Sequence, residues 1–401
     1  MTRPTVVLAF SGGLDTSFCV PWLRERGHDV VTLFVDSGGT DDAEKRYIAE
    51  RSRELGAVDH VVEDAGDALW REVVVPLVRG GALYQDMYPL LCSDRYVIAR
   101  KGLELCKRIG TTLFAHGCTG MGNDQVRFDA TVHALGDFTI LAPIRDVQSQ
   151  HKNVRAFEQA YLEERGFAVR AKTSRYSINA NLLGVTTSGA EIDQFQAPGD
   201  ETWVLCAPPS RWPREPRRVT LGFARGAALT LDGEAVAGPE MLRRLNALFG
   251  EYGVGRGIYT GDTTIGLKGR IVFECPGLTA LLVAHRALEQ AILTAPQNAF
   301  KPLAAQKWVE LVYKGLFHEP LKYDLEALLE SSQRAVSGRV TLETHGGICH
   351  PVAIDSPHIL RAAGAVYAQS ADWGAAQAEG FIRLFDQSTT ISSRVNPIER
   401  L

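Results

Sequence analysis

The feature that most constrains this chain is the alternation of short apolar runs with amphipathic segments over residues 1–165. The apolar runs have the residue types and lengths of β-strands, and they lie at Thr5–Phe10, Val30–Val35, Val58–Val62, Thr112–Ala115 and Thr139–Leu141. Segments with helical spacing separate them, at Thr16–Arg26, Asp42–Leu55, Arg95–Arg108 and Asp124–Leu135. Alternation of this kind predicts βαβ units and an α/β domain built on a doubly wound, parallel five-stranded sheet.

The pattern changes near residue 170 and predicts an α+β domain followed by a C-terminal helical extension. Two hairpins are expected, Val219–Ala224 with Ala227–Leu231 and Val340–Thr344 with Val352–Ile354. Helices are expected from Pro239 onward and at Leu281–Leu293, Gln306–Leu316, Leu321–Ala335 and Ala375–Phe385, with a polar tail after the last. We therefore predict domains at residues 1–168, 169–370 and 371–401.

Composition excludes several classes of protein. The 401 residues include 43 Lys and Arg against 47 Asp and Glu, so the net charge of −4 gives no general basic field for nucleic acid. The basic loop Ala207–Arg218 is interpreted as solvated surface. No stretch approaches the roughly 18 apolar residues of a membrane span. The seven cysteines never form C-x-x-C, and the first residues lack a secretory signal, which predicts a cytoplasmic protein without a disulfide framework or a metal site.

The segment Ser11–Ser17, between the first predicted strand and helix, has the features of a phosphate loop. Gly12 and Gly13 let the backbone approach an anion, and the helix N-terminus adds partial positive charge. A Walker loop is excluded because its lysine is missing, and a dinucleotide fingerprint because Thr16 stands where its third glycine would be. The structural alternative is a Gly-Gly turn capped by Asp15.

A second ligand loop is expected at His116–Phe128, after the fourth strand and at the same sheet edge. Three glycines precede Asn123 and Asp124, and Arg127 follows one helical turn after Asn123, so that both side chains can face one ligand. The structural alternatives are helix capping by Asn123 or Asp124 and a surface arginine at position 127.

The first loop resembles the S-G-G-x-D-[ST]-S loop of the ATP-pyrophosphatases, enzymes that cleave ATP to AMP and pyrophosphate. With the second loop included, the chain resembles the argininosuccinate synthase family over its whole length. Phe10 replaces a tyrosine and Met121 a lysine of that family's loops. Further matching segments are Arg175–Gly184, Tyr252–Arg256, Lys268–Arg270 and Ala378–Ile382.

The resemblance implies condensation of citrulline with aspartate through a citrullyl-adenylate, with ATP as co-substrate, Mg²⁺ carried by the nucleotide, and a homotetramer joined through the C-terminal helix. It implies ATP contacts at Ala9, Phe10, Ser11, Gly12, Gly13, Leu14, Asp15, Thr16, Ser17, Val35 and Gly117. Aspartate would be bound by Thr119, Asn123 and Asp124, and citrulline by Tyr88, Ser93, Asn123, Arg127, Ser177 and Thr186. Catalytic roles would fall to Asp15, Asp124 and Arg127.

The chain also departs from the family pattern. Thr186 replaces a serine, Gly261 replaces a citrulline-binding glutamate with Asp262 adjacent, and Phe273 replaces a tyrosine. His116 is a candidate proton acceptor beside the second loop. Two alternatives stay open: another adenylating enzyme of this loop family, acting on tRNA or forming an amide, and a non-catalytic nucleotide-binding protein.

Overall fold

The computed structural model describes residues 3–169, 175–236, 238–362, 366–367 and 369–396. The chain divides into two compact units, Met1–His358 and Ile359–Leu401. The predicted junction at 168/169 borders residues 170–174, which lie outside the described residues. The two predicted domain boundaries, at 168/169 and 370/371, therefore stay predictions.

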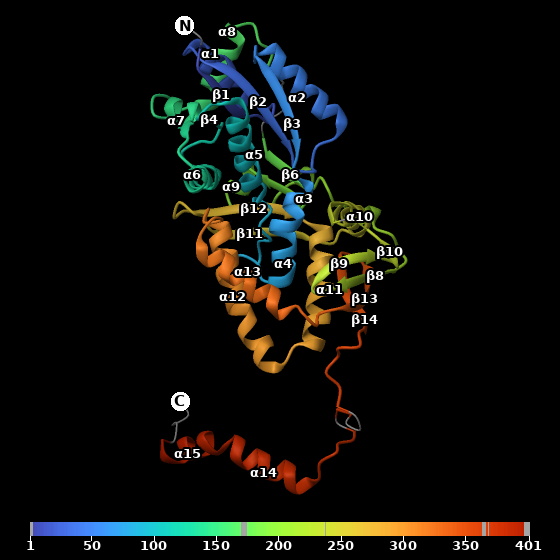
Figure 1. Ribbon diagram of the computed structural model, residues 1–401. Coiled ribbons are helices and arrows are strands. Elements are labelled where there is room, and N and C mark those ends of the chain that lie inside the picture. Colours follow the sequence, from blue (N-terminus) through green and yellow to red (C-terminus); the bar gives the residue numbers. More distant parts are fainter. Residues whose placement is uncertain (1–2, 170–174, 237, 363–365, 368, 397–401) are drawn as a thin grey trace. The chain divides into compact units, whose positions relative to one another are not determined.

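The first part of the larger unit is a parallel sheet (Figure 1). Its strands run in the order β3-β2-β1-β4-β5 and span β1 (Thr5–Ala9), β2 (Asp29–Asp36), β3 (Asp59–Asp64), β4 (Leu113–Ala115) and β5 (Thr139–Leu141). Side chains of β1 alternate between two apolar clusters: Val6 and Leu8 belong to one, Val7 and Ala9 to the other. Both faces of the sheet are therefore covered, and the predicted α/β class is confirmed.

Helices flank this sheet at α1 (Leu14–Glu25), α2 (Asp42–Glu54), α5 (Asp94–Ile109), α6 (Asn123–Leu135), α7 (Pro143–Gln148) and α8 (Val154–Glu164). Sequence analysis missed α7, α8 and a continuous helical run formed by α3 (Gly66–Leu69), the π-helical turn η1 (Trp70–Val74) and α4 (Val75–Gly80). The run of Val73, Val74 and Val75 favours a strand by intrinsic preference. Val73 and Val74 are fully buried here, so tertiary packing outweighs that preference.

The second part of the larger unit contains two antiparallel sheets. One has the order β10-β9-β8-β13-β14 and consists of β8 (Arg217–Ala224), β9 (Ala227–Leu231), β10 (Glu234–Ala235), β13 (Gly338–His345) and β14 (Ile348–Asp355). It contains both predicted hairpins. The other has the order β11-β12-β7-β6 and was not predicted; it consists of β6 (Ser177–Asn181), β7 (Gly184–Ser188), β11 (Arg256–Asp262) and β12 (Lys268–Glu274).

Two of the long helices of this part begin close to the predicted positions, but those predicted at Leu281–Leu293 and Gln306–Leu316 begin earlier, at Pro276 and Ala295. The long ones are α10 (Gly238–Glu251), α11 (Pro276–Ile292), α12 (Ala295–Tyr313) and α13 (Pro320–Ser332). The short ones are α9 (Ala190–Asp193), η2 (Asp200–Thr202) and η3 (Pro209–Arg211). Met241, Leu242, Leu245 and Phe249 form the fully buried face of α10, as their spacing predicts.

The smaller unit contains α14 (Ala375–Phe385), at the predicted bounds, and α15 (Gln387–Val395). The segment after Phe385 is polar as predicted, but sequence analysis missed that it contains a second helix. The sequence of α15, QSTTISSRV, has too few apolar residues to show a helical period.

The two parts of the larger unit meet at the loop after β2. Leu182 N–H donates to the Ser37 carbonyl at 2.7 Å. Beside it, a Cβ on Gly39 would stand 2.2 Å from the Ala180 carbonyl carbon. Only glycine permits such a close approach of two backbones. This contact sets the β6–β7 hairpin against the parallel sheet.

Candidate active site

The topology of the parallel sheet brings the two predicted ligand loops together. Because β1 lies between β2 and β4, the strand order reverses at β1, and ligands bind at such a reversal beyond the carboxyl ends of the strands. The loops after β1 and β4 meet there. A Cβ on Gly117 would stand 3.0 Å from Thr16 Cγ2 and 3.3 Å from the Thr16 nitrogen. The two loops therefore lie against each other at this edge of the sheet.

The backbone N–H groups of the first loop are not capped by a side chain at the start of α1. Gly12 has a φ of +73°, and Gly13 is the N-cap of α1 without a capping side chain. The Asp15-capped turn is therefore excluded. Thr16 Oγ1 accepts from Ser11 N–H at 3.3 Å and lies 3.2 Å from Ser11 Oγ. The first N–H groups of α1 have no helical acceptor, which is the arrangement that binds phosphate.

A buried carboxyl pair underlies this loop. Glu158 of α8 is fully buried beside Asp15. Burial, together with the Asp15 charge, raises the pKa of Glu158 to about 8, and burial also raises the pKa of Asp15. Glu158 therefore favours its protonated, neutral form near neutral pH. Sequence analysis missed Glu158, because a single glutamate on a short amphipathic helix carries no signal of burial.

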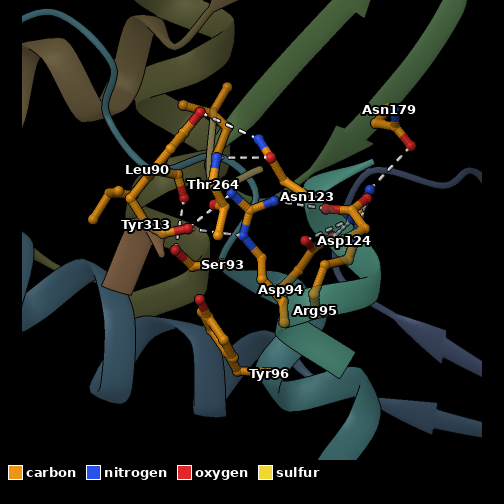
Figure 2. A network of polar contacts seen from close by, with 12 residues as sticks. Leu90, Ser93, Asp94, Arg95, Tyr96, Asn123, Asp124, Asn179, Thr264 and Tyr313 are labelled. Atoms are coloured by element: carbon orange, nitrogen blue, oxygen red, sulfur yellow. Dashed lines mark hydrogen bonds and ion pairs between the residues drawn. The ribbon is translucent and has the colours of Figure 1, made fainter. Parts of the chain in front are cut away.

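Asn123 is held by the second part of the unit instead of capping α6. The N-cap of α6 is Gly122, and no side chain caps this end. Asn123 Oδ1 accepts from Thr264 N–H at 2.9 Å, and Nδ2 donates to Tyr313 Oη at 3.3 Å (Figure 2). The capping interpretation is therefore wrong for Asn123 and for Asp124.

Two arginines hold the Asp124 carboxylate, one at each oxygen. Arg127 Nη1 donates to Oδ1 at 2.7 Å and Arg95 Nε to Oδ2 at 3.0 Å. Burial raises the pKa of Asp124, but the two guanidinium charges outweigh burial and leave the pKa below its ordinary value. Asp124 is therefore ionised at neutral pH.

Arg127 is not a surface arginine. Its side chain is 3% exposed, and Nε and Nη2 donate to the Tyr313 carbonyl at 3.3 and 3.0 Å. Tyr88 and Ser93 are buried in the same region, with Ser93 Oγ donating to the Leu90 carbonyl at 2.8 Å and the Tyr88 ring 6.0 Å from that of Tyr313. The structure brings Tyr88, Asn123 and Arg127 together around Tyr313, a residue that sequence analysis did not single out.

The other predicted residues lie around this centre. Ser177 is exposed on β6, and Thr186 of β7 is paired in register with Phe273 of β12. Val35 is buried near the carboxyl end of β2. Thr119 Oγ1 would lie 3.7 Å from a Cβ on Gly122, so the second loop folds back on itself.

Beside Gly261, where the resemblance implies a glutamate, the space that a side chain would need is occupied by Gln85. A Cβ on Gly261 would stand 2.2 Å from Gln85 Oε1 and 2.4 Å from Tyr259 Oη. Gln85 Oε1 accepts from Tyr259 Oη at 2.7 Å, and Nε2 donates to Asp262 Oδ2 at 2.6 Å. Asp262 also pairs with Lys268 and lines an open cavity of about 730 Å³ with Tyr84, Gln85 and Thr264.

His116 is not available to accept a proton from a substrate. Its Nδ1 accepts from Cys118 N–H at 3.2 Å, and Nε2 lies 2.9 Å from Asp129 Oδ1. Arg145 Nη2 also lies 3.2 Å from Nε2. With the ring 1% exposed and both nitrogens engaged, the expectation that His116 is a base loses its support.

The described residues contain no group of three or more His, Cys, Asp or Glu side chains that could hold a metal ion. All seven cysteines are free thiols. Within the part of the chain that the structure describes, every helix is too short or too polar to cross a membrane.

A doubly wound sheet with a glycine-rich phosphate loop after β1 defines a nucleotide-binding domain. Residues 5–166 match the family described as the arginosuccinate synthase N-terminal HUP domain, and residues 176–392 match the arginosuccinate synthase C-terminal domain. The chain belongs to the argininosuccinate synthase family.

Curated relatives support this assignment over the full length. The chain is 60% identical over 396 residues to the argininosuccinate synthase of Xanthomonas campestris pv. campestris, covering 99% of this chain and 100% of the relative. It is 57% identical to that of Xylella fastidiosa over 396 residues, 99% of each chain. It is 35% identical to that of Bacillus cytotoxicus over 401 residues, 99% and 98% of the two chains.

Proposed function

We propose that this chain is a ligase that joins citrulline to aspartate and converts ATP to AMP and pyrophosphate. The observation that carries the proposal is the close approach of Gly117 to Thr16, because it brings the loop that leads to Asn123–Arg127 against the loop Ser11–Ser17. A protein that only bound nucleotide would need the first loop alone.

The chemistry begins with the ureido group of citrulline, whose oxygen is a poor leaving group. Attack of this oxygen on the α-phosphorus of ATP forms the citrullyl-adenylate and releases pyrophosphate. The backbone N–H groups of Ser11–Ser17 and the N-terminus of α1 stabilise the charge on the phosphates, and Mg²⁺ enters as part of the nucleotide substrate. The aspartate ammonium then releases a proton to solvent, the free amine attacks the activated carbon, and AMP leaves.

The amino-acid contacts are proposed as the resemblance places them. Thr119, Asn123 and Asp124 bind aspartate, and the ionised Asp124 suits an ammonium group. Tyr88, Ser93, Asn123, Arg127, Ser177 and Thr186 bind citrulline. Holding both amino acids beside one nucleotide supplies rate through orientation. Because Asn123 and Arg127 are bonded to Thr264 and Tyr313, substrate binding must exchange or share these internal contacts.

The experiment is product analysis with ureido-¹⁸O citrulline, aspartate and ATP. The mechanism requires the label to finish in the phosphate of AMP, since the ureido oxygen bonds to the α-phosphorus and stays there. Label in pyrophosphate, or ADP and phosphate as products, would overturn it. An AMP-forming reaction that needs tRNA or ammonia in place of aspartate would support the alternative adenylating enzyme.

We also propose a cytoplasmic homotetramer in which the unit Ile359–Leu401 contacts neighbouring subunits. Its support is that the described part of this unit exposes large apolar side chains, with Phe381, Leu384 and Phe385 at 64%, 74% and 77%. Light scattering on the full chain and on a chain ending at His358 tests this. A tetramer from both would refute the role of the unit.

A further inference from the structure

The Arg95 guanidinium forms hydrogen bonds with three different side chains. It is the second residue of α5, and its side chain is 15% exposed. Nη1 donates to both oxygens of Asp94, at 2.7 and 2.8 Å. Nε donates to Asp124 Oδ2 at 3.0 Å, and Nη2 to Asn179 Oδ1 at 3.2 Å (Figure 2). One guanidinium therefore bridges three side chains.

These contacts join three elements that carry proposed substrate residues. Ser93 immediately precedes α5, and Asp124 lies in the first turn of α6. Asn179 lies on β6 two residues after Ser177, so both side chains are on the same face of that strand. Arg95 thus links the start of α5 and the first turn of α6 to β6, in addition to the backbone contact of Leu182 with Ser37.

The orientation of Asp124 depends on Arg95 as much as on Arg127. Each arginine bonds a different oxygen of the carboxylate, so removing Arg95 frees Oδ2 and leaves the group to turn toward Arg127. The buried Asp94, 2% exposed, would also lose its partner. Thiols of Cys92 and Cys118 lie near Asp124, and burial raises the pKa of both, so they remain neutral and add no charge.

We propose that Arg95 is a positioning residue of the amino-acid site: it presents the Asp124 carboxylate to the substrate ammonium and fixes the β6 strand beside it. The inference rests on the proposed function, because aspartate is the ligand assigned to Asp124. In this proposal Arg95 acts through Asp124 and not on the substrate directly, so its loss should raise the Michaelis constant for aspartate and leave that for ATP unchanged.

The test compares the purified full-length variants Arg95→Gln, Arg95→Lys and Asn179→Ala. Arg95→Gln should raise the Michaelis constant for aspartate about ten- to a hundred-fold, the worth of a charge-assisted hydrogen bond, with that for ATP unchanged. Arg95→Lys keeps the charge and should recover part of the loss. Asn179→Ala cuts only the link to β6, and should raise the citrulline constant more than the aspartate constant.

The matched control is Arg100→Gln, on the same helix. Arg100 is 27% exposed and bonds both oxygens of Glu72 at 2.6 and 2.8 Å, away from the site. Its kinetic constants should equal those of the parent protein. Thermal unfolding of each variant separates misfolding from mispositioning, and if Arg95→Gln does not fold, the lysine variant carries the comparison.

The inference is overturned if Arg95→Gln folds and leaves the aspartate constant unchanged, if it raises the ATP constant equally, or if Arg95→Lys is no better than Arg95→Gln. A parent protein that makes no argininosuccinate refutes the proposed function instead. In that case the folded variants still report on Arg95, through the ¹³C chemical shift of the Asp124 carboxyl. That signal should titrate at higher pH in Arg95→Gln than in the parent, and an unchanged titration would overturn the inference.

Discussion

Replacing Arg127 with alanine should damage both the fold and citrulline binding. The substitution removes three donor contacts, two to the Tyr313 carbonyl and one to Asp124. The carbonyl then stays buried without these donors. Asp124 keeps its contact with Arg95 and is 36% exposed, so the carboxylate contributes less to the loss.

The magnitude follows from these contacts. A buried carbonyl left without a partner costs about 1–3 kcal/mol, and breaking a fully buried ion pair costs about 3–5 kcal/mol. Since this pair is only partly buried, we expect Arg127→Ala to lower the free energy of unfolding by about 2–4 kcal/mol. Urea denaturation followed by circular dichroism measures it. Under native conditions, the Michaelis constant for citrulline should rise roughly ten- to a hundred-fold while that for ATP stays constant.

Two comparisons make the result decisive. Arg127→Lys has one ammonium that can reach Asp124 or the Tyr313 carbonyl but cannot reproduce the planar fork, so it should fall between alanine and the parent. Arg100→Ala removes a partly exposed pair and should cost about 1 kcal/mol or less. If Arg127→Ala unfolds within about 0.5 kcal/mol of the parent, the buried contacts do not carry stability and the reasoning fails. A raised ATP constant with an unchanged citrulline constant would refute the site assignment.

Gly39→Ala should lower the free energy of unfolding by about 1–3 kcal/mol or more in urea denaturation, because the added Cβ meets the Ala180 backbone at 2.2 Å. The control is Gly380→Ala, which should be neutral or stabilising because nothing lies within 4 Å of its Cβ. Glu158→Gln should become increasingly more stable than the parent protein as pH rises from about 4.5 to about 8. The reason is that a carboxyl whose pKa is raised on folding lowers stability across that window, and glutamine does not ionise. Equal thermal unfolding of the two proteins at pH 8.5 would contradict this. Asp262→Asn should raise the citrulline requirement and leave ATP binding alone if Asp262 serves the ligand's amino group; unchanged citrulline kinetics would exclude that role.

Elements with clear residue spacing and turn residues could be predicted from the sequence alone. The strand–loop–helix unit from Thr5 through α1 and the helix Ala375–Phe385 follow from residue spacing, because periodicity and turn chemistry act over a few residues. The same signals were absent for β11, whose sequence RGIYTGD has glycines at two of its seven positions, and misleading for the valine run of η1 and α4.

The sequence by itself determined the class of the first domain, the two ligand loops and the residues that belong to them. Only the tertiary structure decided what those residues contact. Arg127 and the Tyr313 carbonyl are 186 positions apart, and Arg95 and Asn179 are 84 apart. Contacts over such separations depend on how whole elements pack and on which side chains meet, and no local pattern of residues encodes that. For the same reason the burial of Glu158 against Asp15, and the use of both His116 nitrogens, became visible only once α8 and α6 had been placed beside the sheet.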